Sequence, residues 1–189
     1  MSDMKLDTAH SALLVMDFQT EVVEGYAVDQ DRLLAATEGV IAAARDGGMP
    51  VIYVVVAYRA GFPEISPHNK VFSALKASGG IAAKIHPRIE PDAGEIIVTK
   101  RRVSAFMGTD LDMILRSNGI HTLVLCGVVT SGVVLSTLCH AADSDYRLVV
   151  LRDCCSDIDQ GAHALLMEKV FPRHATLLTS AELIDILRD

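Results

Sequence analysis

The chain has 189 residues, half of them apolar, and its mean hydropathy is +0.33. This length and composition predict one domain, residues 1–189, with a sizeable buried core. The formal net charge of -7 argues against a nucleic-acid partner, because phosphate binding needs clustered basic side chains. The one tight basic cluster is Lys100-Arg101-Arg102.

The chain carries no sign of export or membrane insertion. Its amino terminus lacks the basic and apolar segments of a signal peptide, so we expect a cytoplasmic protein. Residues 122–142 are long enough to span a bilayer, but Gly127, Thr130, Ser131 and Gly132 interrupt them and predict a strand, a turn and a helix. The four cysteines have no metal-ligand spacing and are expected to be buried thiols.

Short apolar, β-branched runs alternate along the chain with longer helical patterns. This alternation predicts an α/β fold: a Rossmann-like, three-layer αβα sandwich around a mostly parallel six-stranded sheet. The expected strands cover residues 12–16, 51–56, 96–99, 123–126, 148–151 and 176–178. The expected helices cover residues 31–45, 69–77, 110–117, 131–142, 160–170 and 181–187. Residues 60–70 and 79–94, rich in Gly and Pro, predict long loops that could shape a site.

Ligands of open α/β sheets bind beyond the carboxyl ends of the strands, so the residues that follow each strand are candidates. Asp17 follows the first expected strand and Lys100 follows the third. A buried aspartate tuned by a nearby lysine can transfer protons, although Asp17 could equally cap a turn and Lys100 could be a solvated charge. The turn at residues 127–132 offers backbone N–H groups to an oxyanion or a carboxylate, or is a plain connection.

Three segments together resemble a known family. They are Leu-Val-Met-Asp-Phe-Gln at residues 14–19, Lys-Arg-Arg-Val-Ser-Ala-Phe at 100–106, and Leu-Val-Leu-Cys-Gly-Val-Val-Thr at 123–130, preceded by Gly-Ile at 119–120. In this order they are similar to the isochorismatase-like hydrolases, also called the cysteine hydrolase superfamily. The resemblance covers residues 17 to about 153 and implies a single domain of that type.

The resemblance implies that Asp17 and Lys100 are catalytic, together with a cysteine three residues after Thr130. That position holds Val133, which has no nucleophilic atom, so the covalent thioester route of the amide-cleaving members is not available there. The resemblance also implies a cis peptide bond between Val128 and Val129, with the N–H groups of Val129 and Val133 facing the substrate.

Other side chains carry nucleophilic atoms, but their positions do not favour them as a replacement. Cys139 lies six residues beyond Val133 on the same helix and should point elsewhere, and Cys126 should be buried in a strand. Ser131 and Thr130 lie in the turn, but no G-x-S-x-G pattern surrounds them. His68, His86 and His163 are expected to be loop or surface residues.

Substrate binding is assigned to Arg59, Gln19 and Phe18. Arg59 follows the second strand, where its guanidinium could grip a substrate carboxylate, although it could equally be a solvated surface residue. Some relatives carry an Asp/His metal cluster near this point, but here only His68 is close by. We therefore expect neither a metal nor a cofactor.

The sequence thus predicts a hydrolase without a cysteine nucleophile that acts on a small, anionic molecule. Asp17 would be the acid and base, and Lys100 would tune or orient it. The resemblance implies a vinyl-ether substrate for members without the cysteine. Two alternatives stay open: a catalytically inactive homologue that binds a ligand or a protein, and an amidase with a relocated nucleophile. We also expect a homo-oligomer, either a dimer or a tetramer.

Overall fold

The structure is a computed structural model that describes residues 5–188, and its centre is a six-stranded sheet in the order β3-β2-β1-β4-β5-β6. All five strand pairings are parallel. The strands are β1 (Ser11–Met16), β2 (Val51–Val56), β3 (Ile96–Lys100), β4 (Thr122–Val128), β5 (Arg147–Ser156) and β6 (Thr176–Leu178). The predicted α/β class and the six strands are confirmed.

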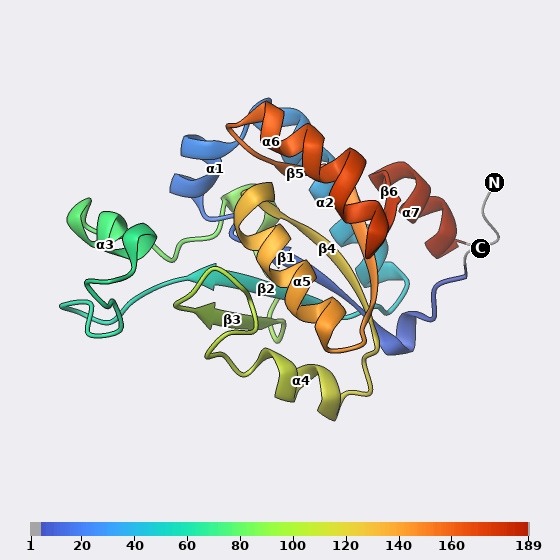
Figure 1. Ribbon diagram of the computed structural model, residues 1–189. Helices are drawn as coiled ribbons and strands as arrows, with labels where there is room; N and C mark the ends of the chain where they lie inside the picture. Colours follow the sequence, from blue (N-terminus) through green and yellow to red (C-terminus); the bar gives the residue numbers. More distant parts are fainter. Residues whose placement is uncertain (1–4, 189) are drawn as a thin grey trace.

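Helices cover both faces of the sheet and make the outer layers (Figure 1). The α-helices are α1 (Thr20–Tyr26), α2 (Gln30–Asp46), α3 (Lys70–Ala77), α4 (Leu111–Ser117), α5 (Leu135–Asp143), α6 (Gln160–Leu165) and α7 (Ser180–Arg188). Two π-helical turns, η3 (Thr130–Val134) and η4 (Leu166–Val170), adjoin α5 and α6. The 3-10 turns are η1 (Thr8–His10), η2 (Pro87–Ile89) and η5 (Phe171–Arg173).

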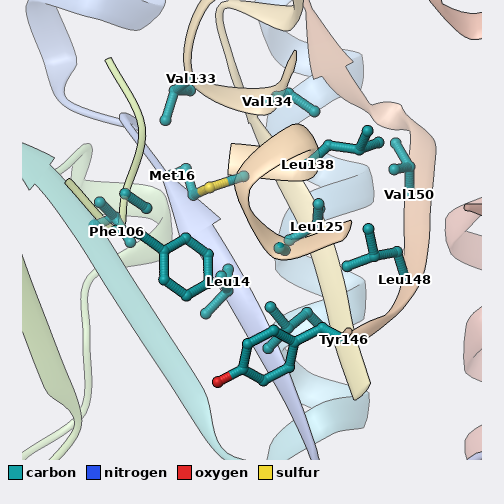
Figure 2. Packing of buried hydrophobic residues seen from close by; sticks show 14 of the residues in the cluster. Leu14, Met16, Phe106, Leu125, Val133, Val134, Leu138, Tyr146, Leu148 and Val150 are labelled. Carbon is teal, nitrogen blue, oxygen red and sulfur yellow. The ribbon is translucent and has the colours of Figure 1, made fainter. Parts of the chain in front are cut away.

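Two apolar clusters fill the spaces between the layers, because successive side chains of each strand point to opposite faces. On one face, Leu14 and Met16 of β1 pack with Leu125 of β4 and Leu138 of α5 (Figure 2). On the other face, Leu13 and Val15 join the buried side chains of α1, α2 and α7. Strands β1, β2 and β4 are buried along their whole length and therefore read as continuous, mostly apolar runs in the sequence.

Four elements differ from the sequence prediction. The helix α1 was not predicted, because it is short and contains two valines and a glycine. Strand β5 continues five residues past the predicted end at residue 151 and includes the charged Arg152 and Asp153. Its last residues pair with β4 again after a shift in register between Leu125 and Gly127. The predicted helices at 131–142 and 160–170 each contain one of the π-helical turns.

The order of the strands reverses between β1 and β4. The chain adds β2 and then β3 on one side of β1, and afterwards returns to place β4 on the other side. In such sheets the ends of the two central strands leave a crevice where ligands bind. Among residues 5–188, no helix has the length and apolar character that crossing a bilayer requires.

Candidate active site

Asp17 and Lys100 form a buried ion pair at the carboxyl edge of the sheet. Asp17 follows β1 and Lys100 ends β3, so the lysine side chain reaches across the end of β2, which lies between them. Lys100 Nζ lies 2.8 Å from Asp17 Oδ2. Asp17 is 7% exposed and Lys100 is 3% exposed, so bulk water screens this pair little.

The backbone holds Asp17 in an uncommon conformation. Its φ angle is 58°, in the left-handed region that aspartate tolerates better than most residues. Its N–H donates to the carbonyl of Val54 on β2 at 2.8 Å. Lys100 is fixed as well, because its ammonium donates to the carbonyl of Arg102 at 3.2 Å. Both charged groups are therefore positioned by the main chain.

The environment of Asp17 favours the protonated carboxyl. Burial raises the pKa of Asp17 above its usual value, and the nearby charge and hydrogen bond of Lys100 oppose this effect without cancelling it. Within the part of the chain that the structure describes, Asp17 Oδ1 is buried without a hydrogen-bond partner. The carboxyl group thus has one oxygen held by Lys100 and one that is buried without a partner among the described residues.

The loop after β4 forms a second wall of the site. The peptide bond between Val128 and Val129 is cis, and the chain then enters η3. Asp157, at the end of β5, accepts a hydrogen bond of 2.8 Å from the N–H of Ser131. Thr130 Oγ1 lies 2.9 Å from Nδ1 of His163, on α6. Two contacts from neighbouring elements therefore hold this loop.

Glycine is required where this loop leaves the sheet. A Cβ atom at Gly127 would lie 2.9 Å from the carbonyl oxygen of Met16 and 3.1 Å from Cγ2 of Val134. Real Cβ atoms do not approach a backbone oxygen so closely, and a larger residue would push β4 away from β1.

A cavity of about 530 Å³ opens between these elements, a size typical of small-molecule sites. Its floor contains Asp17 and Lys100, and its sides come from α1, α3, the loops beyond β2 and β3, and the loop after β4. The lining residues are Asp17, Val22, Tyr26, Val56, Val71, Phe72, Ala74, Leu75, Ser78, Ile81, Lys100, Val103, Val128, Val129, Ser131, Gly132 and Val133. The structure thus brings together the predicted Asp17, Lys100, Val128, Val129 and Val133.

Gln19 and Phe18 belong to the framework and do not line the cavity. The Gln19 side chain exchanges two hydrogen bonds with the backbone of Val56, at 2.7 and 3.0 Å, and donates to the carbonyl of Ala82. Phe18 is 2% exposed and packs in the apolar cluster beside α1 and α2. Neither side chain is among the cavity lining, so our expectation of substrate contacts finds no support.

Arg59 also lies outside the cavity lining. Its side chain is 67% exposed and pairs with Glu64 in the same loop. Because this guanidinium pairs with Glu64 outside the cavity, the predicted contact between Arg59 and a substrate carboxylate finds no support here.

The cysteines of the described residues lie elsewhere in the fold. Cys126, Cys154 and Cys155 are buried, and burial raises the pKa of each thiol, that of Cys155 to about 12. Cys139 is exposed on α5. Val133 does line the cavity and is 2% exposed, packed against Met16 and Val134 (Figure 2).

Sequence reasoning missed several residues of the site. Asp157 was overlooked because Arg152 and Asp153 made β5 look shorter, which concealed its carboxyl end. His163 was expected to be a surface residue, yet it contacts Thr130, and burial lowers its pKa. The walls from α1 and α3 carry no chemical signal in their sequence, and only the folded chain brings them to Asp17.

One group of potential metal ligands in the described chain lies far from the cavity in the fold. Asp7, His10 and His121 are exposed, and their ligand atoms lie within 4.8 Å of one another. His10 precedes β1 and His121 precedes β4, so the group is at the amino edge of the sheet. The cavity is at the opposite edge.

Comparisons with known proteins agree with this architecture. The sequence pattern of the isochorismatase domain matches residues 11–182. YwoC of Bacillus subtilis, an isochorismatase family protein, is 30% identical over 189 residues, covering 98% of each chain. Maleamate amidohydrolase of Pseudomonas putida is 28% identical, covering 94% of this chain and 86% of its own. The structure of an isochorismatase family protein from Burkholderia thailandensis superposes with a TM-score of 0.86, 26% identity and full coverage of both chains. The chain therefore belongs to the isochorismatase family.

Proposed function

We propose that the chain is a hydrolase of small molecules that uses Asp17 as acid and base and needs no cysteine nucleophile. The observation that carries this proposal is the buried Asp17 carboxyl, whose Oδ1 is unpartnered among the described residues, in the floor of the cavity. Its raised pKa supports the acid role, because a general acid must hold its proton near the working pH.

The reaction that best suits these groups is the hydrolysis of a vinyl ether. Protonated Asp17 gives its proton to the terminal alkene carbon, and the π electrons form the new C–H bond. The ether carbon becomes an oxocarbenium ion, and a water molecule attacks it while returning a proton to the Asp17 carboxylate. The resulting hemiketal or hemiacetal separates into an alcohol and a carbonyl compound. No step requires a covalent bond to the protein.

Lys100 has an electrostatic part in this proposal. Its ammonium holds Asp17 Oδ2 at 2.8 Å and leaves Oδ1 without a partner among the described residues, so we assign the transferred proton to Oδ1. When the proton has left, the same ammonium stabilises the carboxylate. Lys100 therefore limits how far burial can raise the pKa and keeps Asp17 able to cycle between both forms.

Amide hydrolysis is the competing reaction, since relatives such as maleamate amidohydrolase carry that activity in their names. The covalent route needs a nucleophile in the cavity, and the position implied by the resemblance holds Val133. Of the cavity-lining residues within 5–188, Ser131, Ser78 and Tyr26 carry hydroxyl groups. The histidine nearest to this loop, His163, contacts Thr130 and not Ser131. The geometry thus favours the vinyl-ether reaction over a relocated nucleophile.

A panel of substrates tests this proposal. The purified protein is incubated with two enol ethers, isochorismate and butyl vinyl ether, and with two amides, butyramide and maleamate. We expect turnover of an enol ether and no inactivation by iodoacetamide. Turnover of amides alone would contradict the proposed chemistry, and loss of activity after thiol alkylation would point to a relocated cysteine.

The variant Asp17→Asn separates an enzyme from a binding module. Asparagine keeps the shape and can still accept a hydrogen bond from Lys100, but it cannot supply the proton. We expect turnover to fall by about 10²–10⁴-fold, the usual contribution of a general acid. The control Asp46→Asn changes an exposed aspartate at the end of α2 and should leave turnover unchanged. If the wild type binds ligands but hydrolyses nothing in the panel, the inactive-homologue alternative gains support.

A further inference from the structure

The cavity that contains Asp17 has polar groups at its floor and apolar groups on its sides. Val22 and Tyr26 of α1 face it, as do Val71, Phe72 and Leu75 of α3. Helix α3 lies beyond the carboxyl ends of β2 and β3 (Figure 1), so it covers the cavity from outside the sheet. A bound molecule must therefore place its reacting bond at the floor and the rest of its body against these apolar side chains.

The charges inside the cavity are already paired with each other. Lys100 and Asp17 are the charged residues among the described cavity-lining residues, and they lie in contact at 2.8 Å. Lys100 also donates to the carbonyl of Arg102. The other polar side chains of the lining, Tyr26, Ser78 and Ser131, are uncharged hydroxyl groups.

Three arginines from the loops beyond β2 and β3 are directed toward one glutamate. Arg59 and Arg101 both pair with Oε1 of Glu64. Arg102 donates to the carbonyl of Glu64 at 3.1 Å, and its guanidinium lies 5.9 Å from the centre of the Phe72 ring. Three positive charges thus surround Glu64, and none of the three residues lines the cavity.

A carboxylate on the outer part of a substrate would have no cationic partner against these sides. Burying an unpaired charge costs several kcal/mol, whereas burying an apolar group is favourable by about 25 cal/mol per Å². We infer that the substrate is a small, uncharged molecule whose non-reacting part is an alkyl or aryl group, held between α1 and α3. This inference rests on the proposed function for the position of the reacting bond at Asp17.

Two ethers of nearly equal size test the preference for an uncharged ligand by binding alone, because neither contains a vinyl group that the protein could hydrolyse. Ethyl butyl ether is neutral, whereas 3-ethoxypropanoate carries a carboxylate in place of the end of the butyl chain. Their binding to the wild-type protein is measured by ligand-observed NMR at one pH and ionic strength. We expect the neutral ether to bind at least about tenfold more tightly. Equal or tighter binding of the carboxylate, or no binding of the neutral ether, would overturn the inference.

Replacing one apolar residue of the cavity wall with a cationic residue should reverse the preference for the neutral ether. Leu75 is half-buried on α3, so an arginine there can keep its backbone position and offer a guanidinium to the cavity. For Leu75→Arg we expect the affinity for 3-ethoxypropanoate to rise and that for ethyl butyl ether to fall. The control Leu75→Met keeps an apolar side chain of similar size and should keep the wild-type preference. A reversed preference in Leu75→Met, or none in a folded Leu75→Arg, would contradict the inference.

Hydrolysis of the matching vinyl ethers separates this inference from the proposed function. Butyl vinyl ether and 3-(vinyloxy)propanoate both release acetaldehyde when cleaved, which can be measured with alcohol dehydrogenase and NADH. If the neutral ether binds preferentially but neither compound is cleaved, the inference stands and the proposed reaction fails. If the carboxylate is cleaved with the higher kcat/KM, the proposed reaction stands and the inference fails.

Discussion

Asp17 combines two opposing influences on one carboxyl group. Burial favours its neutral form and Lys100 favours its charged form, and the balance leaves the pKa raised. The prediction that Asp17 and Lys100 lie close together came from a simple rule, since each follows an apolar strand at the same edge of a parallel sheet. The same rule could not predict whether the side chains of Gln19 and Arg59 point into the cavity, because it does not give the orientation of a side chain beyond the strand end.

We predict that kcat/KM on a vinyl ether decreases as pH rises through the folded-state pKa of Asp17, because the proton donor is then lost. Replacing Lys100 with methionine removes the ammonium that lowers this pKa, so the decreasing limb should move to higher pH in Lys100→Met. The control Lys169→Met changes an exposed lysine in η4 and should keep the wild-type profile. An unmoved limb in Lys100→Met would contradict the assignment of Asp17 as the acid.

The same pKa shift links pH to stability. Since the folded protein binds the Asp17 proton more tightly than the unfolded chain, the stabilisation is fully present below the unfolded pKa. It is lost as pH rises through the folded pKa. The free energy of unfolding of the wild type, relative to Asp17→Asn, should therefore decrease with rising pH in urea titrations. A difference that does not vary with pH would argue against the raised pKa.

At the scale of secondary-structure elements, the sequence predicted those helices and strands that have a periodic or strongly apolar pattern. The six strands were located because each contains a short run of apolar, often β-branched residues. Helix α1 was missed because seven residues with two valines and a glycine show little helical preference. Helix α3 was predicted, but its place at the cavity depends on the long loops around it, and their course leaves no periodic trace in the sequence.

We predict that Asp157→Ala lowers both stability and kcat/KM. Asp157 is 2% exposed and accepts from the N–H groups of Ser131 and Asp159, so its loss removes two hydrogen bonds to a buried carboxylate and costs roughly 1–3 kcal/mol. Since Ser131 lines the cavity, the loop should also lose its position. Asp159→Ala is the matched control: it removes the cap of α6 at a cost of about 1 kcal/mol but should leave kcat/KM unchanged. Urea titrations and initial rates on the same preparations measure both effects.

Two glycines offer a second matched pair. Gly127→Ala places a Cβ 2.9 Å from the carbonyl of Met16, so we expect a loss of roughly 1–3 kcal/mol in the free energy of unfolding. Gly25 lies in α1 with open space around its Cβ position, and Gly25→Ala should stabilise the protein by about 0.5–1 kcal/mol. Urea unfolding of both variants checks the opposite signs, and a stabilised Gly127→Ala would mean that β1 and β4 can separate without cost.

At the scale of the whole molecule, the surface keeps several large apolar side chains exposed. Met107, Met113 and Leu165 are 54%, 67% and 58% exposed. We predict self-association into a dimer or a tetramer, which would cover such side chains. Light scattering coupled to size-exclusion chromatography should give a mass about two or four times the chain mass of 20.3 kDa. A mass equal to that of one chain across micromolar concentrations would contradict this prediction.

The reversal of strand order between β1 and β4 also governs when the site can form during synthesis. Asp17, Lys100 and Val129 come from three separate parts of the chain and meet only after β1 to β4 have paired. Such contacts between distant segments form slowly, because the intervening chain must first lose its freedom. Until Val129 has emerged from the ribosome, the nascent chain cannot form the complete cavity. For the same reason, recovery of ligand binding after denaturation reports the assembly of the central sheet.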